Sequence, residues 1–533
     1  MSFDSLTSKA LDRRRLLAGG GGLVLASSFG ISGLAQAAPR FADYVFGLGV
    51  ASGDPWPDGF VIWTRLAPKP LEEHAGMPRG RYPVIWEVAE DEGFTRIVRN
   101  GQELAHPELA HSLHVEVTGL QSQRPYFYRF RIDGGDASPV GMAKTAPAAG
   151  VEVQRARIAV AGCQHYQAGH YTAWRHLSRE DDLDLVFHYG DYIYEGGPVA
   201  NPPRILDTQG QPVDRTHVGG EIYSLDDYRR RYAQYKADPD LQAAHAAAAF
   251  VSSFDDHEID NNWVDTFDQD GTDPQVFIHR RRAAMQAWYE NMPIRRAQRP
   301  NARGNLTMFR RMDYGNLFRM HVLDTRSYRT DQYCEQVGQS ACRIDDGTGS
   351  TILGPRQEQW LDNGLSRSAR WNLIAQQVFI MPVVRKAPDG TITKGGTDTW
   401  GGYPDARQRL IKSITDKGLT NVVVASGDAH IHAVGHVPMR DDELDGPAAA
   451  VEFLATSISS GSDGAPDNAG TIAMKAGSPH MKLVNAQRGY QLFDIRPDVW
   501  RTELKVLDKV TTSDGKLSTL ASFNVTPDQP KLV

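Results

Sequence analysis

The sequence predicts an α/β sandwich that is preceded by a small all-β sandwich. Between residues 43 and 146, short runs rich in β-branched and aromatic residues alternate with turns of Gly, Pro and Asp, which is typical of an all-β domain. Beyond residue 151, short apolar runs without clean alternation indicate strands that are buried on both faces, and helical patterns separate them. At 533 residues, the chain exceeds what one hydrophobic core usually supports, so we expect one small and one large domain.

The first residues have the pattern of an export signal. Three consecutive arginines, residues 13–15, precede a weakly apolar run rich in Gly and Ala, residues 16–34, and an A-x-A sequence then ends at Ala37. This pattern predicts a Tat-type signal peptide over residues 1–37, passage through the Tat translocase, and a periplasmic or secreted mature protein. An uncleaved membrane anchor is the alternative, because the run is long enough to span a bilayer.

Residues 41–148 are expected to form a β-sandwich of the immunoglobulin (Ig) or fibronectin type. The predicted strands cover residues 59–66, 82–88, 112–120 and 126–132. The stretch LQSQRPYFYRFRI is similar to the strand of a fibronectin-like domain that carries a structural tyrosine, so we assign it to packing and not to catalysis. A linker rich in Ala, Pro and Gly, residues 145–150, ends this domain.

Residues 151–533 are expected to form the α/β domain. Its predicted strands cover residues 157–161, 183–188, 317–323 and 421–426. Its predicted helices cover the Ala-rich residues 242–251, residues 280–291, and residues 357–366, which follow Pro355 as helices often do.

Composition and charge exclude several functions. With 41% apolar and 23% charged residues, the chain has the composition of a soluble globular protein. The net charge is -7 and the 58 Lys and Arg residues are scattered, so no basic stripe indicates nucleic-acid binding. The acidic balance also disfavours binding to anionic membrane surfaces.

The three cysteines divide into a pair and a single residue. Cys334 and Cys342 lie in one polar loop, and a disulfide between them is the simplest interpretation in an oxidising compartment. Cys163 is then unpaired. Metal ligation would protect such a thiol, whereas burial as a small apolar side chain is the alternative.

Metal-competent side chains follow several predicted elements, in the segments AGCQH, HYGDYIYEG, SFDDHEIDNNW and ASGDAHIHAV. The ligand crevice of an open α/β sheet lies at the carboxyl ends of its strands, so these segments are predicted to share one site. The candidate site residues are Cys163, Asp191, Tyr194, Asp256, His257, Asp428 and His430. Thiolate, phenolate and imidazole suit a transition ion, whereas carboxylates suit a harder ion such as calcium. Taken singly, each segment also fits a turn, a cap or a solvated loop.

In this order, the segments resemble the PhoD-type alkaline phosphatases, a branch of the calcineurin-like metallophosphoesterase superfamily. The resemblance extends over FGLGVASGDPWPDGFVIWTRL, LDTRSYR, LGPRQEQWL and WNLIAQQV, and so over nearly the whole chain. It implies a metallophosphoesterase-type α/β/β/α sandwich behind an Ig-like domain, and a site with one ferric ion (Fe3+) and one or two calcium ions (Ca2+). By this resemblance, iron would be held by Cys163, Asp191, Tyr194 and His430, and calcium by Asp191, Asp256 and Asp428, with Asp191 bridging.

The resemblance further implies an alkaline phosphatase or phosphodiesterase that uses a metal-activated water. His257 would face the substrate and stabilise the transition state or protonate the leaving group. Arg326, carried over as a catalytic residue, and Gln377 would contact phosphate or support the site. A structural salt bridge or a polar contact in the core is the alternative for both.

The substrate is expected to be a small-molecule or lipid phosphoester, and the protein to be a monomer without specific nucleic-acid binding. Monoester and diester substrates both stay open. Three other functions also stay open: a phospholipase D-like phosphodiesterase of the same family, a hydrolase with Cys163 as its nucleophile, and a calcium-binding structural protein.

Overall fold

The computed structural model describes residues 41–332 and 348–533, which belong to one compact unit, Pro39–Val533. The predicted signal peptide and the predicted disulfide between Cys334 and Cys342 lie outside the described residues. Within the described ranges, no helix combines the length and the apolar character that a membrane crossing requires.

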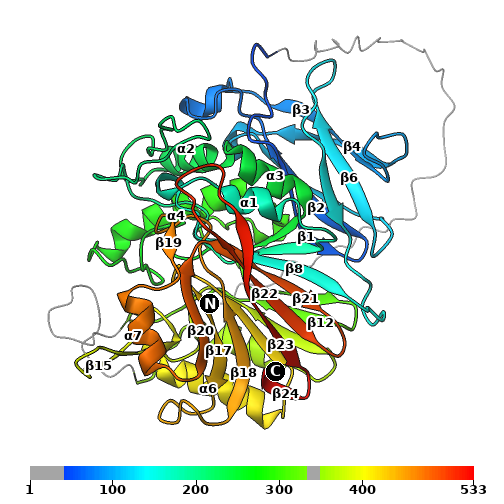
Figure 1. The fold of residues 1–533 in the computed structure, drawn as a ribbon. Coiled ribbons are helices and arrows are strands. Elements are labelled where there is room, and N and C mark those ends of the chain that lie inside the picture. The colour runs from blue at the N-terminus through cyan, green and yellow to red at the C-terminus, as the bar shows by residue number, and fades with distance from the viewer. Residues whose placement is uncertain (1–40, 333–347) are drawn as a thin grey trace, which may run out of the picture. The chain divides into compact units, whose positions relative to one another are not determined.

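The first of two large sheets has ten strands in the described part of the chain. Their order is β24 (Gln529–Leu532), β23 (Leu517–Thr526), β22 (Trp500–Leu507), β21 (Gly489–Ile495), β8 (Ala156–Ala161), β9 (Leu185–His188), β10 (Ala249–Ser252), β1 (Val50–Trp56), β2 (Gly59–Arg65) and β5 (Ser112–Val117). Its strands β8, β21 and β22 lie side by side in Figure 1. The central strands β8, β9, β10 and β1 run parallel. They are buried on both faces, which explains why their sequences lack alternation.

The second large sheet has eight strands among the described residues. Their order is β11 (Arg310–Tyr314), β12 (Phe318–Val322), β13 (Trp371–Ala375), β16 (Val422–Ser426), β18 (Ala448–Leu454), β17 (His432–Pro438), β20 (Met481–Gln487) and β19 (Gly464–Ala465). The strands β12, β13, β16 and β18 run parallel. A separate hairpin pairs β14 (Val384–Lys386) with β15 (Ile392–Lys394).

The two large sheets pack face to face between layers of helices. Phe187 of β9 and Leu373 of β13 share one core, whereas Ile374, the next residue of β13, belongs to a second core on the other face. The first core also takes side chains from α1 (Thr172–Leu177), α2 (Leu225–Lys236), α3 (Pro239–Ala247) and α4 (Pro274–Asn291). The second core takes side chains from α5 (Gly354–Gly364), α6 (Pro404–Asp416) and α7 (Ala469–Gly477). The α/β/β/α fold class is therefore confirmed.

The N-terminal strands form a smaller sandwich that shares a sheet with the large one. A four-stranded sheet of described residues contains β4 (Ile97–Ala105), β3 (Tyr82–Ala89), β6 (Pro125–Arg131) and β7 (Gly141–Lys144). It packs on β1, β2 and β5 through a core that includes Phe60, Val84 and Tyr128. Because β1 pairs in parallel with β10, with Ser52 opposite Ala249, this sandwich continues into the ten-stranded sheet. The boundaries at residues 148 and 151 stay a prediction.

The Ala-rich helix predicted for residues 242–251 is wrong at its carboxyl end. Helix α3 ends at Ala247, and Ala249–Ser252 form strand β10. These four residues pair with β9 on one side and with β1 on the other. Pairing on both edges outweighs the intrinsic helix propensity of alanine, which amounts to only tenths of a kcal/mol per residue.

Short 3-10 helices lie in the connections between these elements. They are η1 (Glu73–Gly76), η2 (Pro107–Leu109), η3 (Tyr166–Ala168), η4 (Arg296–Gln298) and η5 (Trp400–Gly402).

Candidate metal centre

Four loops that follow parallel strands bring all seven predicted site residues together. These are Cys163 after β8, Asp191 and Tyr194 after β9, Asp256 and His257 after β10, and Asp428 and His430 after β16. Three of the strands belong to the first large sheet and β16 belongs to the second. The site therefore lies where the carboxyl ends of strands from the two sheets meet, as expected for an α/β fold.

One half of the site surrounds Asp191. The Tyr194 hydroxyl donates a hydrogen bond to Asp191 Oδ2 at 2.9 Å and lies 3.1 Å from His430 Nε2. The Sγ atom of Cys163 is 3.3 Å from the same Asp191 oxygen. One donor atom each from Cys163, Asp191 and His430 lies within 4.8 Å of the other two. One cation can contact all of these atoms, because metal–ligand bonds are about 2.0–2.6 Å long.

The other half of the site is richer in carboxylates. Asp191, Asp256 and His257 form a second group whose donor atoms lie within 4.8 Å of one another, and Asp255, Asp256 and Asp428 form a third. Asp191 connects the first group to the second, and Asp256 connects the second to the third. The arrangement is a continuous site with room for more than one cation.

The site loops adopt strained backbone conformations. The φ angles of Cys163, Asp191, Asp428 and His430 are 50°, 55°, 69° and 55°. Such left-handed conformations are uncommon for residues other than glycine, and they cluster at functional sites where the surrounding structure enforces them. Gly190 has a φ of 134°, and a Cβ atom there would lie 2.5 Å from the Cβ of Asp255. The loop after strand β9 therefore requires glycine next to Asp191.

Burial dominates the electrostatics of the anionic ligands. It raises the pKa of Asp191 and of Asp428 well above the ordinary value, and the neighbouring carboxylates Asp255 and Asp256 raise both further. Burial, with Asp191 and Asp428, also raises the pKa of the Cys163 thiol well above its usual range. The protein alone thus disfavours the charged forms of these groups, and a cation would favour them.

The pKa values of the two histidines, His430 and His257, are shifted in opposite directions. Burial lowers the pKa of His430 to about 3, so its imidazole is neutral and its nitrogen is free to coordinate. Burial alone would also lower the pKa of His257, but Glu195, Asp256 and Asp191 raise it well above its ordinary value.

Unsatisfied carboxylate oxygens show that the residues fit a metal. Oδ1 of Asp191, Oδ1 of Asp256 and Oδ2 of Asp255 are buried and have no hydrogen-bond partner among the described residues. Leaving a buried charged oxygen without a partner is costly, and carboxylates in such positions are usually paired or coordinate a metal. The additional thiol, phenol and imidazole donors extend the set beyond what calcium or magnesium alone would use.

Glu195 and Glu258 are site residues that the sequence reasoning missed. Glu195 Oε2 lies 2.7 Å from His257 Nδ1, and Glu195 Oε1 accepts a hydrogen bond from the backbone of Asn261. Glu258 accepts backbone hydrogen bonds from Asp191 and Asp255, and so ties two site loops together. Both glutamates stand inside the quoted segments, but nothing in the sequence indicates which loops they connect.

Arg326 lies next to the site, and its guanidinium forms hydrogen bonds with two carboxylates. Its Nε donates to Asp255 at 2.6 Å, and both Nη atoms donate to Asp398 at 2.8 Å. Gln377 is buried and bonds to Thr325 and Leu323. These contacts are a structural salt bridge for Arg326 and a polar contact in the core for Gln377, which were the alternatives to phosphate binding. A direct contact of Arg326 with phosphate stays a prediction.

A cavity of about 280 Å³ opens beside the candidate metal centre. Tyr194 and His430 form one wall, and Ala168, Val199 and Pro203 contribute apolar surface elsewhere. Val199 is exposed, with 42% of its surface accessible. The cavity is the place where the organic part of a substrate could lie.

The fold and the cluster together define a protein of the α/β/β/α class with a candidate metal centre at its strand ends. Comparison with known proteins identifies the family. The family model described as "PhoD-like phosphatase" matches residues 158–504, and the model described as "PhoD-like phosphatase, N-terminal domain" matches residues 33–147.

Individual relatives agree with the family models. Alkaline phosphatase D of Bacillus subtilis (strain 168) is 42% identical over 99% of this chain and 90% of its own length. A solved structure described as "Structure of PhoD" superposes with a TM-score of 0.85 and 43% identity, and covers 93% of each chain. The chain belongs to the PhoD-like phosphatase family, which confirms the resemblance, and it is a phosphoric ester hydrolase.

Proposed function

We propose that the protein is an exported, metal-dependent alkaline phosphatase and phosphodiesterase. In this reaction water adds to phosphorus, the bond to the ester oxygen breaks, and the leaving alcohol takes up a proton. A monoester yields inorganic phosphate and a diester yields a phosphomonoester. The observation that carries the proposal is the continuous set of buried carboxylates with unsatisfied oxygens at the strand ends.

The donor chemistry supports a division into an iron position and a calcium position. Fe3+ would be held by Cys163, Asp191, Tyr194 and His430, and Ca2+ by Asp191, Asp256 and Asp428. Thiolate and phenolate suit the ferric ion, and the carboxylate group suits calcium. Bound cations would supply charge for the phosphate oxygens and would lower the pKa of a water molecule.

His257 and Glu195 form the proton-handling pair of the site. Because Glu195 engages Nδ1 at 2.7 Å, it fixes the ring orientation and leaves Nε2 for the substrate. The ring also lies on Tyr194, with centroids 4.1 Å apart, which limits its rotation. From this position His257 holds a proton at Nε2 that can stabilise a phosphate oxygen or pass to the leaving group.

Arg326 acts by positioning the carboxylates. It is fully buried, and its donors to Asp255 and Asp398 fix it beneath the site. The pKa of Asp256 illustrates the effect, because burial would raise it, but Arg326 and His257 bring it below the ordinary value. Arg326 thereby keeps Asp256 ionised for cation binding.

The cavity beside Tyr194 favours substrates with an organic group next to the phosphate. Its apolar contributors, Ala168, Val199 and Pro203, suit an aryl or alkyl group better than a sugar. This observation keeps a phospholipase D-like phosphodiesterase activity as the second candidate. Export rests on the twin-arginine signal pattern of residues 1–37, from which we propose a periplasmic or secreted location.

The test is hydrolysis by the purified protein of p-nitrophenyl phosphate and bis(p-nitrophenyl) phosphate, before and after exhaustive chelation. We expect chelation to abolish both activities and iron with calcium to restore them. Asp256→Asn, with an unchanged circular dichroism spectrum, should lose at least about 100-fold in kcat/KM. Full activity of the chelated protein, combined with loss on thiol alkylation, would instead support Cys163 as a nucleophile.

A further inference from the structure

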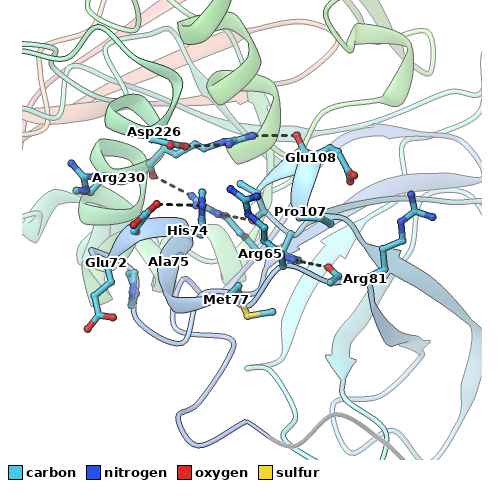
Figure 2. Close-up of a pocket in the computed structure, with 17 residues that line it drawn as sticks. Arg65, Glu72, His74, Ala75, Met77, Arg81, Pro107, Glu108, Asp226 and Arg230 are labelled. Carbon is cyan, nitrogen blue, oxygen red and sulfur yellow. Dashed lines mark hydrogen bonds and ion pairs between the residues drawn. The ribbon is translucent and has the colours of Figure 1, made fainter. Parts of the chain in front are cut away.

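A cavity of about 550 Å³ lies apart from the metal centre (Figure 2). Its walls come from the end of β2 with the η1 segment, from the region around η2, and from the first turns of α2. None of the residues that line it belongs to the metal centre. We propose that this cavity binds a small organic anion, in which one acidic group is attached to an apolar body.

The wall of the cavity contains three arginines without an ion-pair partner among the described residues. Of the four carboxylates in this wall, Glu72 pairs with Lys69, and Asp226 pairs with Arg229, which also binds Glu290. Glu73 and Glu108 lie beside His74 and His106, which carry charge only when protonated. Arg230 pairs with Asp227 outside the wall. For the three other arginines in the wall, Arg65, Arg79 and Arg81, the described residues offer no carboxylate within 4.0 Å. A ligand with a negative group would meet unpaired guanidinium groups here.

Arg65 is the preorganised residue of the proposed site. Only 2% of its surface is exposed, and it lies in the cavity wall. Nε donates to the carbonyl of Ala110 at 3.0 Å, and Nη1 donates to the carbonyl of Arg229 at 3.1 Å and to the Asn291 amide oxygen at 3.3 Å. These bonds fix the guanidinium plane, whereas Nη2 has no acceptor among the described residues.

An anion would stabilise the buried guanidinium of Arg65, because its present hydrogen-bond acceptors are neutral oxygens. Burial lowers the pKa of Arg65 to about 10, an effect that Glu290 offsets in part and Arg229 reinforces. Hydrogen bonds between two charged groups are roughly twice as strong as those between neutral groups. Arginine is also suited to this task, because its planar donors match the oxygens of a carboxylate or phosphoryl group. The acidic group of the ligand is therefore placed at Arg65, and the exposed Arg79 and Arg81 lie in the same wall.

The apolar part of the wall indicates an organic ligand and not an inorganic ion. Pro70, Ala75, Met77 and Pro107 line the same cavity. Its volume falls within the range of about 300–1,000 Å³ that is typical of small-molecule sites. An inorganic phosphate ion would leave this apolar surface uncovered, whereas an aryl or short alkyl group would contact it.

The cavity is linked to the metal centre through helix α2. Arg229 and Arg230 line the cavity, and the next residue, Arg231, donates hydrogen bonds to the carbonyls of Tyr194 and Gly196. An occupant would thus contact the helix turn that holds the Tyr194 loop. The binding proposal itself is independent of the proposed hydrolytic function.

The test locates the ligand directly. Crystals of the mature holoprotein are soaked with 4-bromophenylphosphonate or, separately, with 4-bromobenzoate, and bromine is found by anomalous scattering. We expect bromine near Met77 and Pro107, with the acid group at Arg65. Occupancy by one compound and not the other identifies the preferred acidic group. An empty cavity in crystals soaked with either compound at millimolar concentration overturns the proposal.

Calorimetry with variants provides the second measurement. Titrations use the compound that occupies the cavity, without inorganic phosphate, because phosphate would compete for the same arginines. All variants leave the metal centre unchanged, so a difference between them reports on the cavity. Arg79→Gln combined with Arg81→Gln should weaken binding about tenfold, as should Arg65→Gln if it folds. The matched control is Arg303→Gln, at an exposed position outside the cavity. Equal affinity in the double variant and the control would contradict the proposal, whatever the behaviour of Arg65→Gln.

Discussion

At the scale of single residues, the proposed proton-handling role rests on the pairing of Glu195 with His257. The two side chains are 62 residues apart in sequence and 2.7 Å apart in space. A carboxylate on one imidazole nitrogen fixes the tautomer and the ring plane, so the other nitrogen is presented to the substrate in one orientation. The partnership is charged and largely buried, which strengthens it relative to a surface pair.

Glu195→Gln should therefore lower kcat by about 10- to 100-fold, because the amide keeps the shape of the side chain but loses its charge. KM and the metal content should change little, since Glu195 is not one of the proposed ligands. Steady-state kinetics and elemental analysis of the variant check this. Glu443→Gln, at an exposed loop position, is the matched control. Wild-type kcat in Glu195→Gln would refute the proton-handling role.

Asp398 is the second decisive residue, because it accepts two hydrogen bonds from Arg326 and a third from Arg329. Asp398→Asn should weaken the hydrogen bonds that hold Arg326 and Arg329, while Asp255 still pairs with Arg326, and should destabilise the protein by about 1–3 kcal/mol. Thermal unfolding of the metal-loaded variant measures this effect. An unchanged Tm would mean that Arg326 does not depend on Asp398.

At the scale of elements, the loops after β8, β9 and β16 hold the candidate ligands Cys163, Asp191, Asp428 and His430 in left-handed conformations. Such loops are costly by themselves and persist because neighbouring groups fix them. Glu258 is one such group, since it bonds to the backbone of the Asp191 loop and of Asp255. The short parallel strands thus fix where each loop begins, and the strained loops orient the side chains.

Gly190→Ala tests this dependence. The added Cβ would lie 2.5 Å from Asp255, and the φ of 134° is unfavourable for alanine. We expect a loss of at least about 2 kcal/mol in unfolding free energy and a reduced metal content. Denaturant unfolding and elemental analysis measure both quantities. Gly220→Ala is the control, because an added Cβ there would have no atom within 4 Å and the φ is ordinary. Similar behaviour of the two variants would contradict this dependence.

At the scale of the whole molecule, the small sandwich and the large one share a continuous ladder. β1 lies beside β10, so removal of residues 41–148 would expose the edge of β10 and the apolar contacts around Ala249. An exposed apolar edge promotes aggregation. A chain reduced to residues 149–533 should accordingly be insoluble or melt well below the chain of residues 38–533. A soluble fragment with the same Tm would show that the two parts fold independently.

The sequence alone predicted which candidate residues lie together better than it predicted the contacts between them. Cys163, Asp191 and Asp428 were found because each directly follows an apolar strand, a local pattern that the fold preserves. Glu195 and Asp398 were not found, because their importance depends on partners that only tertiary packing brings near. The error at the end of α3 has the same origin, since strand pairing on both edges of β10 overrode a local helical preference.

The most direct test of the central claim is elemental analysis of the purified mature protein together with its visible spectrum. We predict stoichiometric iron with at least one calcium per chain, and a charge-transfer band that disappears in Tyr194→Phe while the iron remains partly bound through Cys163, Asp191 and His430. A colourless protein that contains neither metal and retains full phosphoesterase activity would contradict it.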